Sequence, residues 1–233
     1  MPVVAAAVCP HPPLLIPELA AGAAGELDDL RAACFAALDG LAAAEPDELV
    51  VVGSGRTTGI RFGAAAGGSF AAYGAPQVAV GDGADVGLPL SLLVGAWLLE
   101  ESTASFLPRT SVVVGADARP AACRHLGEEI AGNPHRLALL VMGDGSARRS
   151  EHAPMHLHPR AEAFDRVVAD ALAGADTETL AALDPDLAAD LGAAGRAPWQ
   201  VLAAAGPGPW RGELRYAAAP YGVGYFVASW SPA

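Results

Sequence analysis

The chain has 233 residues, a net charge of −12 and 52% hydrophobic residues. No uncharged apolar run approaches the roughly 20 residues that a bilayer-spanning helix needs, so we expect no membrane insertion. The acidic balance repels a phosphate backbone and argues against nucleic acid as a partner. All 14 basic residues are arginine, which excludes P-loop and Schiff-base chemistry because both depend on lysine.

The length suits one large α/β domain or two small ones. No internal repeat or break in composition divides the chain, so we predict a single domain over residues 1–233. Its cysteines, Cys9, Cys34 and Cys123, are odd in number and form no CxxC motif, which argues against a disulfide framework and a structural zinc site. The N-terminus lacks the pattern of a signal peptide, and we expect a cytoplasmic location.

The first predicted element is a buried strand at residues 3–8, where the sequence is a short apolar run. The strand ends at Cys9-Pro10, because proline has no N–H to donate to a sheet ladder. His11 follows between prolines, just beyond the carboxyl end of the strand. Ligands of open α/β sheets bind at that edge, so His11 is a candidate metal ligand or acid/base. The alternative is a histidine that only hydrogen-bonds a neighbouring loop.

Helices and strands then alternate along the chain. Helices are predicted at 18–44, 90–101, 119–131, 160–173, 177–183, 185–191 and 195–205. Strands are predicted at 48–52, 77–80, 111–114, 136–142, 213–219 and 223–230, and the last two are expected to form a hairpin around 220–222. This order predicts a three-layer α/β sandwich, in which helices cover both faces of a mixed, mostly parallel central sheet.

A glycine-rich loop at 53–59 follows the second strand and invites comparison with the GxGxxG fingerprint of dinucleotide-binding folds. Its third glycine, Gly59, comes one residue too late, and no clear amphipathic helix follows it. A nucleotide-binding oxidoreductase, with Asp82 as the acidic residue of the fingerprint, is therefore the third hypothesis for function. The chain has no GxSxG motif, so an α/β-hydrolase is not supported.

His152, His156 and His158 lie within residues 147–159, a polar segment interrupted by prolines. Such a composition is typical of a surface or lid loop. Pro154 argues against an unbroken helix that would place the first two histidines on one face. The two interpretations are a weak metal site, for example for zinc, and a solvated loop.

Several segments follow one another in the order of a known family. His11 lies in Cys-Pro-His-Pro-Pro-Leu-Leu, residues 85–90 are Asp-Val-Gly-Leu-Pro-Leu, residues 142–147 are Met-Gly-Asp-Gly-Ser-Ala, and residues 195–199 are Gly-Arg-Ala-Pro-Trp. Together they resemble the class III extradiol ring-cleavage dioxygenases of the LigB type, whose superfamily includes Memo-like proteins. The resemblance implies an α/β fold in which Fe(II) is held by two histidines and one carboxylate, with a further histidine as acid/base.

The chain departs from that family at most positions that carry the chemistry. The substituted positions are Ser54, Gly55 and Arg56 for the second iron histidine, Val86 for the histidine of Asp-His-Gly, Ala147 for the acid/base histidine, and Arg196 with Ala197 near the carboxylate ligand. Of the expected set, His11 alone remains. One imidazole does not hold Fe(II) usefully, so the resemblance implies that ring cleavage has been lost.

We therefore predict a pocket at the strand ends. Its catalytic candidates are His11, Asp144 and Ser146, and its ligand-binding candidates are Ser54, Arg56 and Arg196. Arg56 and Arg196 would form an anion clamp. The first hypothesis is a protein without a cofactor that binds a small anionic or aromatic ligand, or a protein partner. The second is a working dioxygenase that holds Fe(II) or zinc with His11 and the histidine loop. The resemblance also suggests a homodimer.

Overall fold

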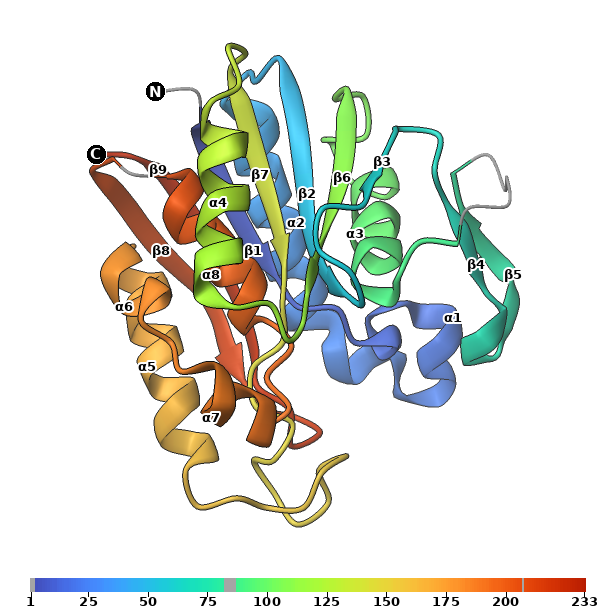
Figure 1. The fold of residues 1–233 in the computed structure, drawn as a ribbon. Helices are drawn as coiled ribbons and strands as arrows, with labels where there is room; N and C mark the ends of the chain where they lie inside the picture. The colour runs from blue at the N-terminus through green and yellow to red at the C-terminus, as the bar shows by residue number, and fades with distance from the viewer. Residues whose placement is uncertain (1–2, 82–86, 207) are drawn as a thin grey trace.

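A seven-stranded sheet of order β3-β6-β2-β7-β1-β9-β8 forms the centre of the molecule in the computed structural model (Figure 1). The structure describes residues 3–81, 87–206 and 208–233. The strands of this sheet are β1 (Val3–Cys9), β2 (Glu48–Gly55), β3 (Arg61–Phe62), β6 (Arg109–Gly115), β7 (Leu137–Met142), β8 (Trp210–Ala218) and β9 (Tyr225–Pro232). The four central strands β6, β2, β7 and β1 are parallel, and the others pair antiparallel with their neighbours. The predicted mixed, mostly parallel sheet is confirmed.

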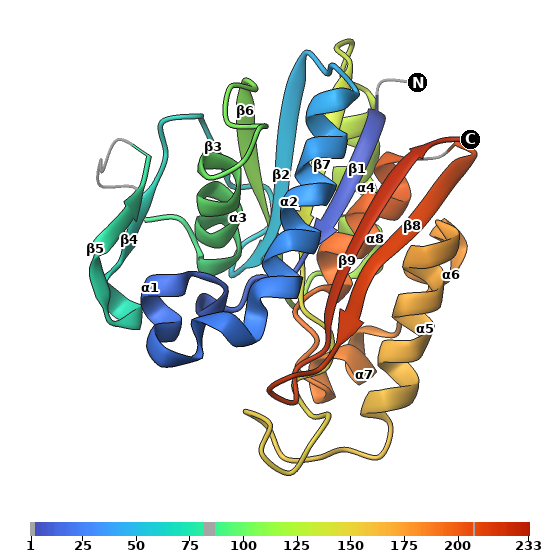
Figure 2. The same ribbon diagram turned by 180° about the vertical axis from the view of Figure 1, so that it is seen from behind.

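Helices cover both faces of this sheet, as the predicted three-layer sandwich requires. α4 (Pro120–Ala131) and α8 (Arg196–Ala205) lie on the face toward the viewer in Figure 1, and α2 (Asp28–Ala43) and α3 (Leu90–Glu100) lie on the face seen in Figure 2. The other helical segments are η1 (Pro13–Leu15), α1 (Pro17–Ala20), η2 (Ala21–Leu27), η3 (Ala71–Tyr73), α5 (Ala161–Gly174), α6 (Thr177–Ala181) and α7 (Pro185–Asp190). Within the described residues, no helix is both long enough and apolar enough to cross a membrane.

The central strands divide their side chains between two apolar clusters, one on each face of the sheet. In β2, Val50 and Val52 belong to the cluster on the α4–α8 side, whereas Val51 belongs to the cluster on the α2–α3 side. Cys9 of β1 and Met142 of β7 also belong to the α2–α3 side. Because successive side chains of a strand point to opposite faces, this assignment fixes which residues can meet beyond the strand ends.

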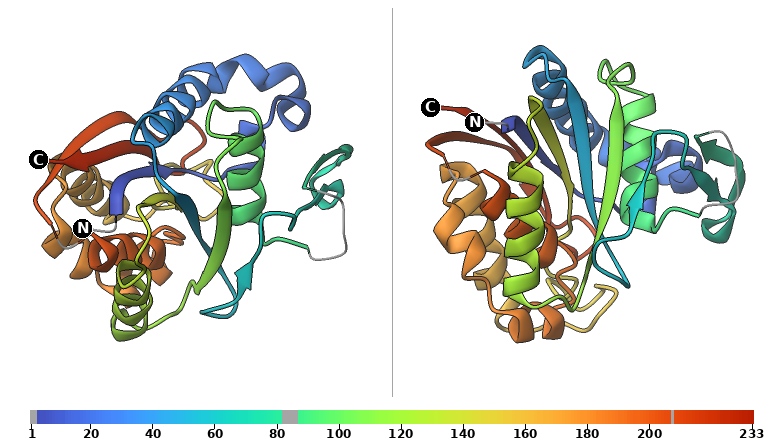
Figure 3. Two further views of the ribbon diagram at one scale, coloured as in Figure 1. Left: turned by 90° about the horizontal axis from the view of Figure 1, so that it is seen from above. Right: turned by 45° about the horizontal axis from the view of Figure 1, so that its top comes forward.

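Two predicted elements differ from those in the structure. The predicted helix at 18–44 is divided into α1, η2 and α2, and Ala21 at the first break has a positive φ of 46°. The predicted strand at 77–80 is part of β5 (Ala75–Val80), which pairs with β4 (Gly68–Phe70) in a separate two-stranded sheet. Figure 3 shows this small sheet beyond α3, away from the seven-stranded sheet.

Candidate functional site

His11 and Asp144 meet at the carboxyl ends of β1 and β7, which are neighbouring parallel strands. The register pairs Cys9 with Met142, and the N–H of Gly143 donates to the carbonyl of Cys9 at 2.9 Å. Pro10 has no N–H, and beyond it the N–H of His11 donates to Oδ1 of Asp144 at 2.8 Å. The side-chain carboxylate of Asp144 therefore takes the place of the next backbone acceptor and holds the ends of β1 and β7 together.

The imidazole of His11 also faces this carboxylate. Its Nδ1 lies 3.5 Å from Oδ1 of Asp144, and the two side chains are 9% and 15% exposed. Nδ1 is buried and makes no hydrogen bond to a described residue. A proton on Nδ1 would be held toward Asp144, which leaves Nε2 as the nitrogen that can meet a ligand. Burial raises the pKa of the Asp144 carboxyl, and the charge and N–H of His11 oppose this rise.

Tyr225 is a third polar residue at this edge, and we did not predict it from the sequence. β9 pairs antiparallel with β1, so that Ala6 lies opposite Trp230 and Val8 opposite Ala228. Tyr225, the first residue of β9, therefore lies toward the carboxyl end of β1. Tyr225 is 3% exposed and belongs to the α2–α3 cluster. Burial and then the charge of Asp144 raise its pKa, so its hydroxyl stays neutral and can donate a hydrogen bond. We call His11, Asp144 and Tyr225 the edge triad.

Ser146 is not placed as a nucleophile, which corrects our catalytic assignment. It is fully buried, its hydroxyl donates to the carbonyl of Leu191 at 3.3 Å, and its N–H donates to Oδ1 of Asp165 at 2.8 Å. Oδ2 of Asp165 accepts from Arg149 at 3.0 Å. Burial raises the pKa of Asp165, and these donors oppose the rise. Ser146 and Asp165 therefore anchor the loop that follows Asp144. The sequence signal for this anchor is the acidic Asp165 among the apolar residues of the buried face of α5.

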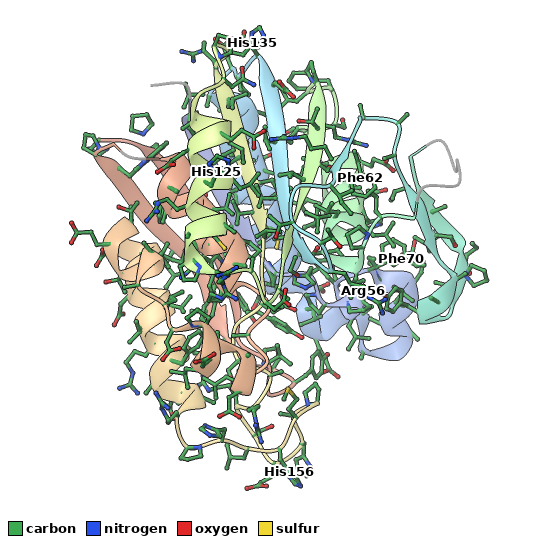
Figure 4. All side chains as sticks on the ribbon, viewed as in Figure 1. Arg56, Phe62, Phe70, His125, His135 and His156 are labelled. Atoms are coloured by element: carbon green, nitrogen blue, oxygen red, sulfur yellow. The ribbon has the colours of Figure 1, made fainter. Side chains whose placement is uncertain are left out.

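The anion clamp predicted for Arg56 and Arg196 is wrong in this structure. Arg196 is 2% exposed, and its guanidinium donates to the carbonyls of Ala118 at 2.5 Å and Ala116 at 2.7 Å and to Gln200 at 3.1 Å. Arg196 thus ties the loop after β6 to α8, and its terminal nitrogens are already occupied. Arg56 lies on the surface after β2 (Figure 4).

The segment predicted as a glycine-rich loop at 53–59 begins as strand, because β2 extends to Gly55. A Cβ at Gly53 would lie 2.5 Å from the hydroxyl of Ser91, and one at Gly55 would lie 2.6 Å from Val113 Cγ1. These glycines allow close packing on β2, and the next elements are β3 and β4, not the helix of a dinucleotide fold. Ser54 lies between them on the other face, and its carbonyl accepts from Ser91 at 2.7 Å. The residues do not form the nucleotide-binding turn of our third hypothesis.

The histidine loop does not bring its imidazoles to one point. Nε2 of His158 lies 3.2 Å from Asp190, Nδ1 of His156 lies 3.8 Å from Glu151, and His152 is exposed. Figure 4 shows His156 at the tip of the loop, and His125 and His135 on α4 and beyond its end. Among residues 3–81, 87–206 and 208–233, no group of three His, Cys, Asp or Glu side chains is placed to hold a metal ion. Asp82, Asp85 and Val86 lie outside the described residues.

Comparisons with known proteins bear on the fold alone. No family model matches the chain, and no curated protein matches it. Among solved structures it is similar to the crystal structure of the uncharacterized protein JW3007 from Escherichia coli K12, with a TM-score of 0.51 and 15% identity, covering 98% of this chain and 99% of that one. At this identity the likeness shows a shared fold and nothing more.

Proposed function

We propose that this chain is a divergent LigB-type protein that does not cleave aromatic rings and instead binds a small aromatic or anionic ligand at the edge triad. The observation that carries the proposal is the pairing of His11 with Asp144 at the carboxyl ends of two central parallel strands. This is the edge at which open α/β sheets bind ligands. The three cysteines are free and buried, which agrees with a reducing compartment such as the cytoplasm.

The described residues do not fit the iron centre of the extradiol enzymes. That centre needs two imidazoles and one carboxylate on one face of the metal. The edge triad supplies one imidazole, and Oδ1 of its carboxylate already accepts the N–H of His11. The β2 residue on the α2–α3 face at this edge is Gly55, which has no side chain, and a Cβ there would lie 2.6 Å from Val113. The described residues therefore do not supply an iron centre of that kind at this edge.

The edge triad suits recognition of a ligand that carries a hydroxyl, phenolate or carboxylate group. Asp144 orients the imidazole, so that Nε2 of His11 can accept a hydrogen bond, or donate one when the ring is protonated. The neutral phenol of Tyr225, whose pKa is raised by burial and by the charge of Asp144, supplies a donor. A phenol or aromatic acid presents both kinds of partner, and the apolar residues of the α2–α3 cluster around the triad suit its ring.

The test uses untagged protein that is purified without oxygen and incubated with Fe(II), because a histidine tag would bind metal itself. We expect no stoichiometric iron by mass spectrometry and saturable binding of 4-nitrocatechol or benzoate in titrations. His11→Ala should weaken that binding about tenfold, a loss of about 1.4 kcal/mol. His125→Ala, on the exposed side of α4, should leave it unchanged.

Two results would contradict the proposal. Stoichiometric iron that is lost in His11→Ala, together with a ring-opened product from a catechol, would favour the second hypothesis of a working dioxygenase. Binding of both probes that is the same in His11→Ala and wild-type protein would place the ligand away from the edge triad.

A further inference from the structure

A hollow of about 790 Å³ lies at the opposite end of the sheet from the edge triad. It is bounded by the second half of α2, the start of β1 and the β8–β9 hairpin, which lie side by side in Figure 2. Its volume is within the range of small-molecule sites in proteins, about 300–1,000 Å³. We call this hollow the arginine groove, for the side chains of Arg136, Arg211 and Arg215 that line it.

The apolar wall of the arginine groove exists because α2 presents small residues there. Ala37, Gly40 and Ala44 line it together with Leu41, and an ideal Cβ built on Gly40 has no heavy atom within 4 Å. Glycine inside a helix costs about 0.5–1 kcal/mol relative to alanine, so this position keeps open space at the expense of helix stability.

The three arginines give the groove a local positive charge in a chain of net charge −12. Glu213 is the one acidic side chain among the described lining residues, and it is paired with Arg215 at 2.7 Å. Arg215 also donates its Nε to Ser229 at 2.7 Å, which holds its guanidinium along the floor of the groove.

Each guanidinium keeps donors that a ligand can use. Arg136 donates from Nε and Nη2 to two carbonyls just after α2, those of Glu45 at 3.4 Å and Ala44 at 3.0 Å. Arg211 is exposed, and its side chain donates no hydrogen bond to another described residue. Since a guanidinium carries five N–H donors, all three can still bind an anion.

From the apolar wall and the cationic floor we infer that the arginine groove binds a small organic anion with an apolar body. Its carboxylate, or a comparable anionic head, pairs with Arg211 and Arg215, and its ring or chain lies along Ala37 and Gly40. The groove shares no residue with the edge triad, so this binding is independent of the proposed function.

The test is calorimetric titration of the full chain with sodium 1-naphthoate and sodium dodecanoate, which present the same head on a ring and on a chain. We expect one saturable site for at least one of them and none for dodecyltrimethylammonium, which reverses the charge. The double variant Arg211→Gln and Arg215→Gln should raise Kd about tenfold or more. Arg119→Gln, an exposed arginine outside the groove, should have no effect.

Gly40→Leu tests the location, because the added side chain fills open space without a clash. It should abolish binding without lowering Tm, and His11→Ala should leave binding intact. The inference is overturned by absence of saturable binding for both anions, by equal binding of the cation, or by wild-type Kd in Gly40→Leu. A concentration-dependent dimer that Arg211→Glu dissociates, with no anion bound, would overturn it in favour of an interface between two copies.

Discussion

Gly143→Ala perturbs the point at which the loop of the edge triad touches α8. Gly143 lies between Met142 and Asp144, and an ideal Cβ there would be 2.5 Å from the Cα of Gly195 and 3.1 Å from Nε1 of Trp199. Non-bonded carbon atoms prefer about 3.5 Å or more, so the two backbone segments must separate by about 1 Å. That movement weakens the hydrogen bond from the N–H of Gly195 to the carbonyl of Asp144, which is 2.8 Å long.

The expected loss is about 3 kcal/mol in the free energy of unfolding. Overpacking contributes about 1–3 kcal/mol, and a weakened backbone hydrogen bond adds about 0.5–1.5 kcal/mol. For a domain of this size, Tm should fall by about 6–12 °C. Urea unfolding followed by circular dichroism gives the free energy, and an unchanged slope with denaturant would show that the unfolded state is not altered.

Gly40→Ala is the matched control, since the same methyl group there meets nothing within 4 Å. It should raise the free energy of unfolding by about 0.5–1 kcal/mol because alanine is the better helix former. The reasoning would be refuted if Gly143→Ala unfolded within about 0.5 kcal/mol of the wild type, the ordinary range of a neutral surface substitution.

Three further predictions concern Asp144, Arg196 and Tyr225. The pKa of Asp144 is raised in the folded protein, so its ionisation lowers the free energy of unfolding as pH rises from the ordinary pKa of 3.8 through the native pKa. In urea titrations, the difference in free energy of unfolding between wild type and Asp144→Asn should therefore shift against wild type as pH rises across that window. A difference that does not change with pH would contradict this. Arg196→Met should lower the free energy of unfolding by about 3 kcal/mol, because it leaves the buried carbonyl of Ala118 and the buried side chain of Gln200 without this donor. Arg56→Met should change it by less than about 0.5 kcal/mol. In absorbance titrations at alkaline pH, Tyr225→Phe should remove the last tyrosine to ionise, and persistence of that step would show that burial acts on another phenol.

The strands of the sheet could be predicted because the residues at both ends of each strand stop the apolar run that forms it. The apolar runs that became β1, β2 and β7 are bounded by proline, glycine or charged residues, and the hairpin of β8 and β9 has a turn at Pro220-Tyr221-Gly222. The failures arise where tertiary contacts decide. The strand at Ala75–Val80 has the same local pattern as the others, and its partner is the short β4 and not the main sheet.

The site could be predicted in part, because strand ends show in the sequence but strand order does not. His11 and Asp144 each follow a predicted strand, and they meet only because β1 and β7 are neighbours although 133 positions separate the two residues. Arg196 was misjudged for a different reason. We expected its guanidinium to be available to a ligand, but the carbonyls of Ala116 and Ala118 that bind it come from a distant loop.

Strand alternation explains which candidates can act together. Cys9, Met142 and Val227 belong to the α2–α3 cluster, and His11, Asp144 and Tyr225 each lie two positions away along the chain, with the same parity. Ser54 follows Val52, a residue of the opposite cluster, by two positions, so its side chain is directed to the other face. A functional histidine contributed by β2 would therefore have to stand at position 55. That position is glycine, and a Cβ there would lie 2.6 Å from Val113 Cγ1. A larger residue at this position would therefore require Val113 of the neighbouring strand to repack as well. Placing a second imidazole beside His11 at this edge would thus need a change in β6 together with one in β2.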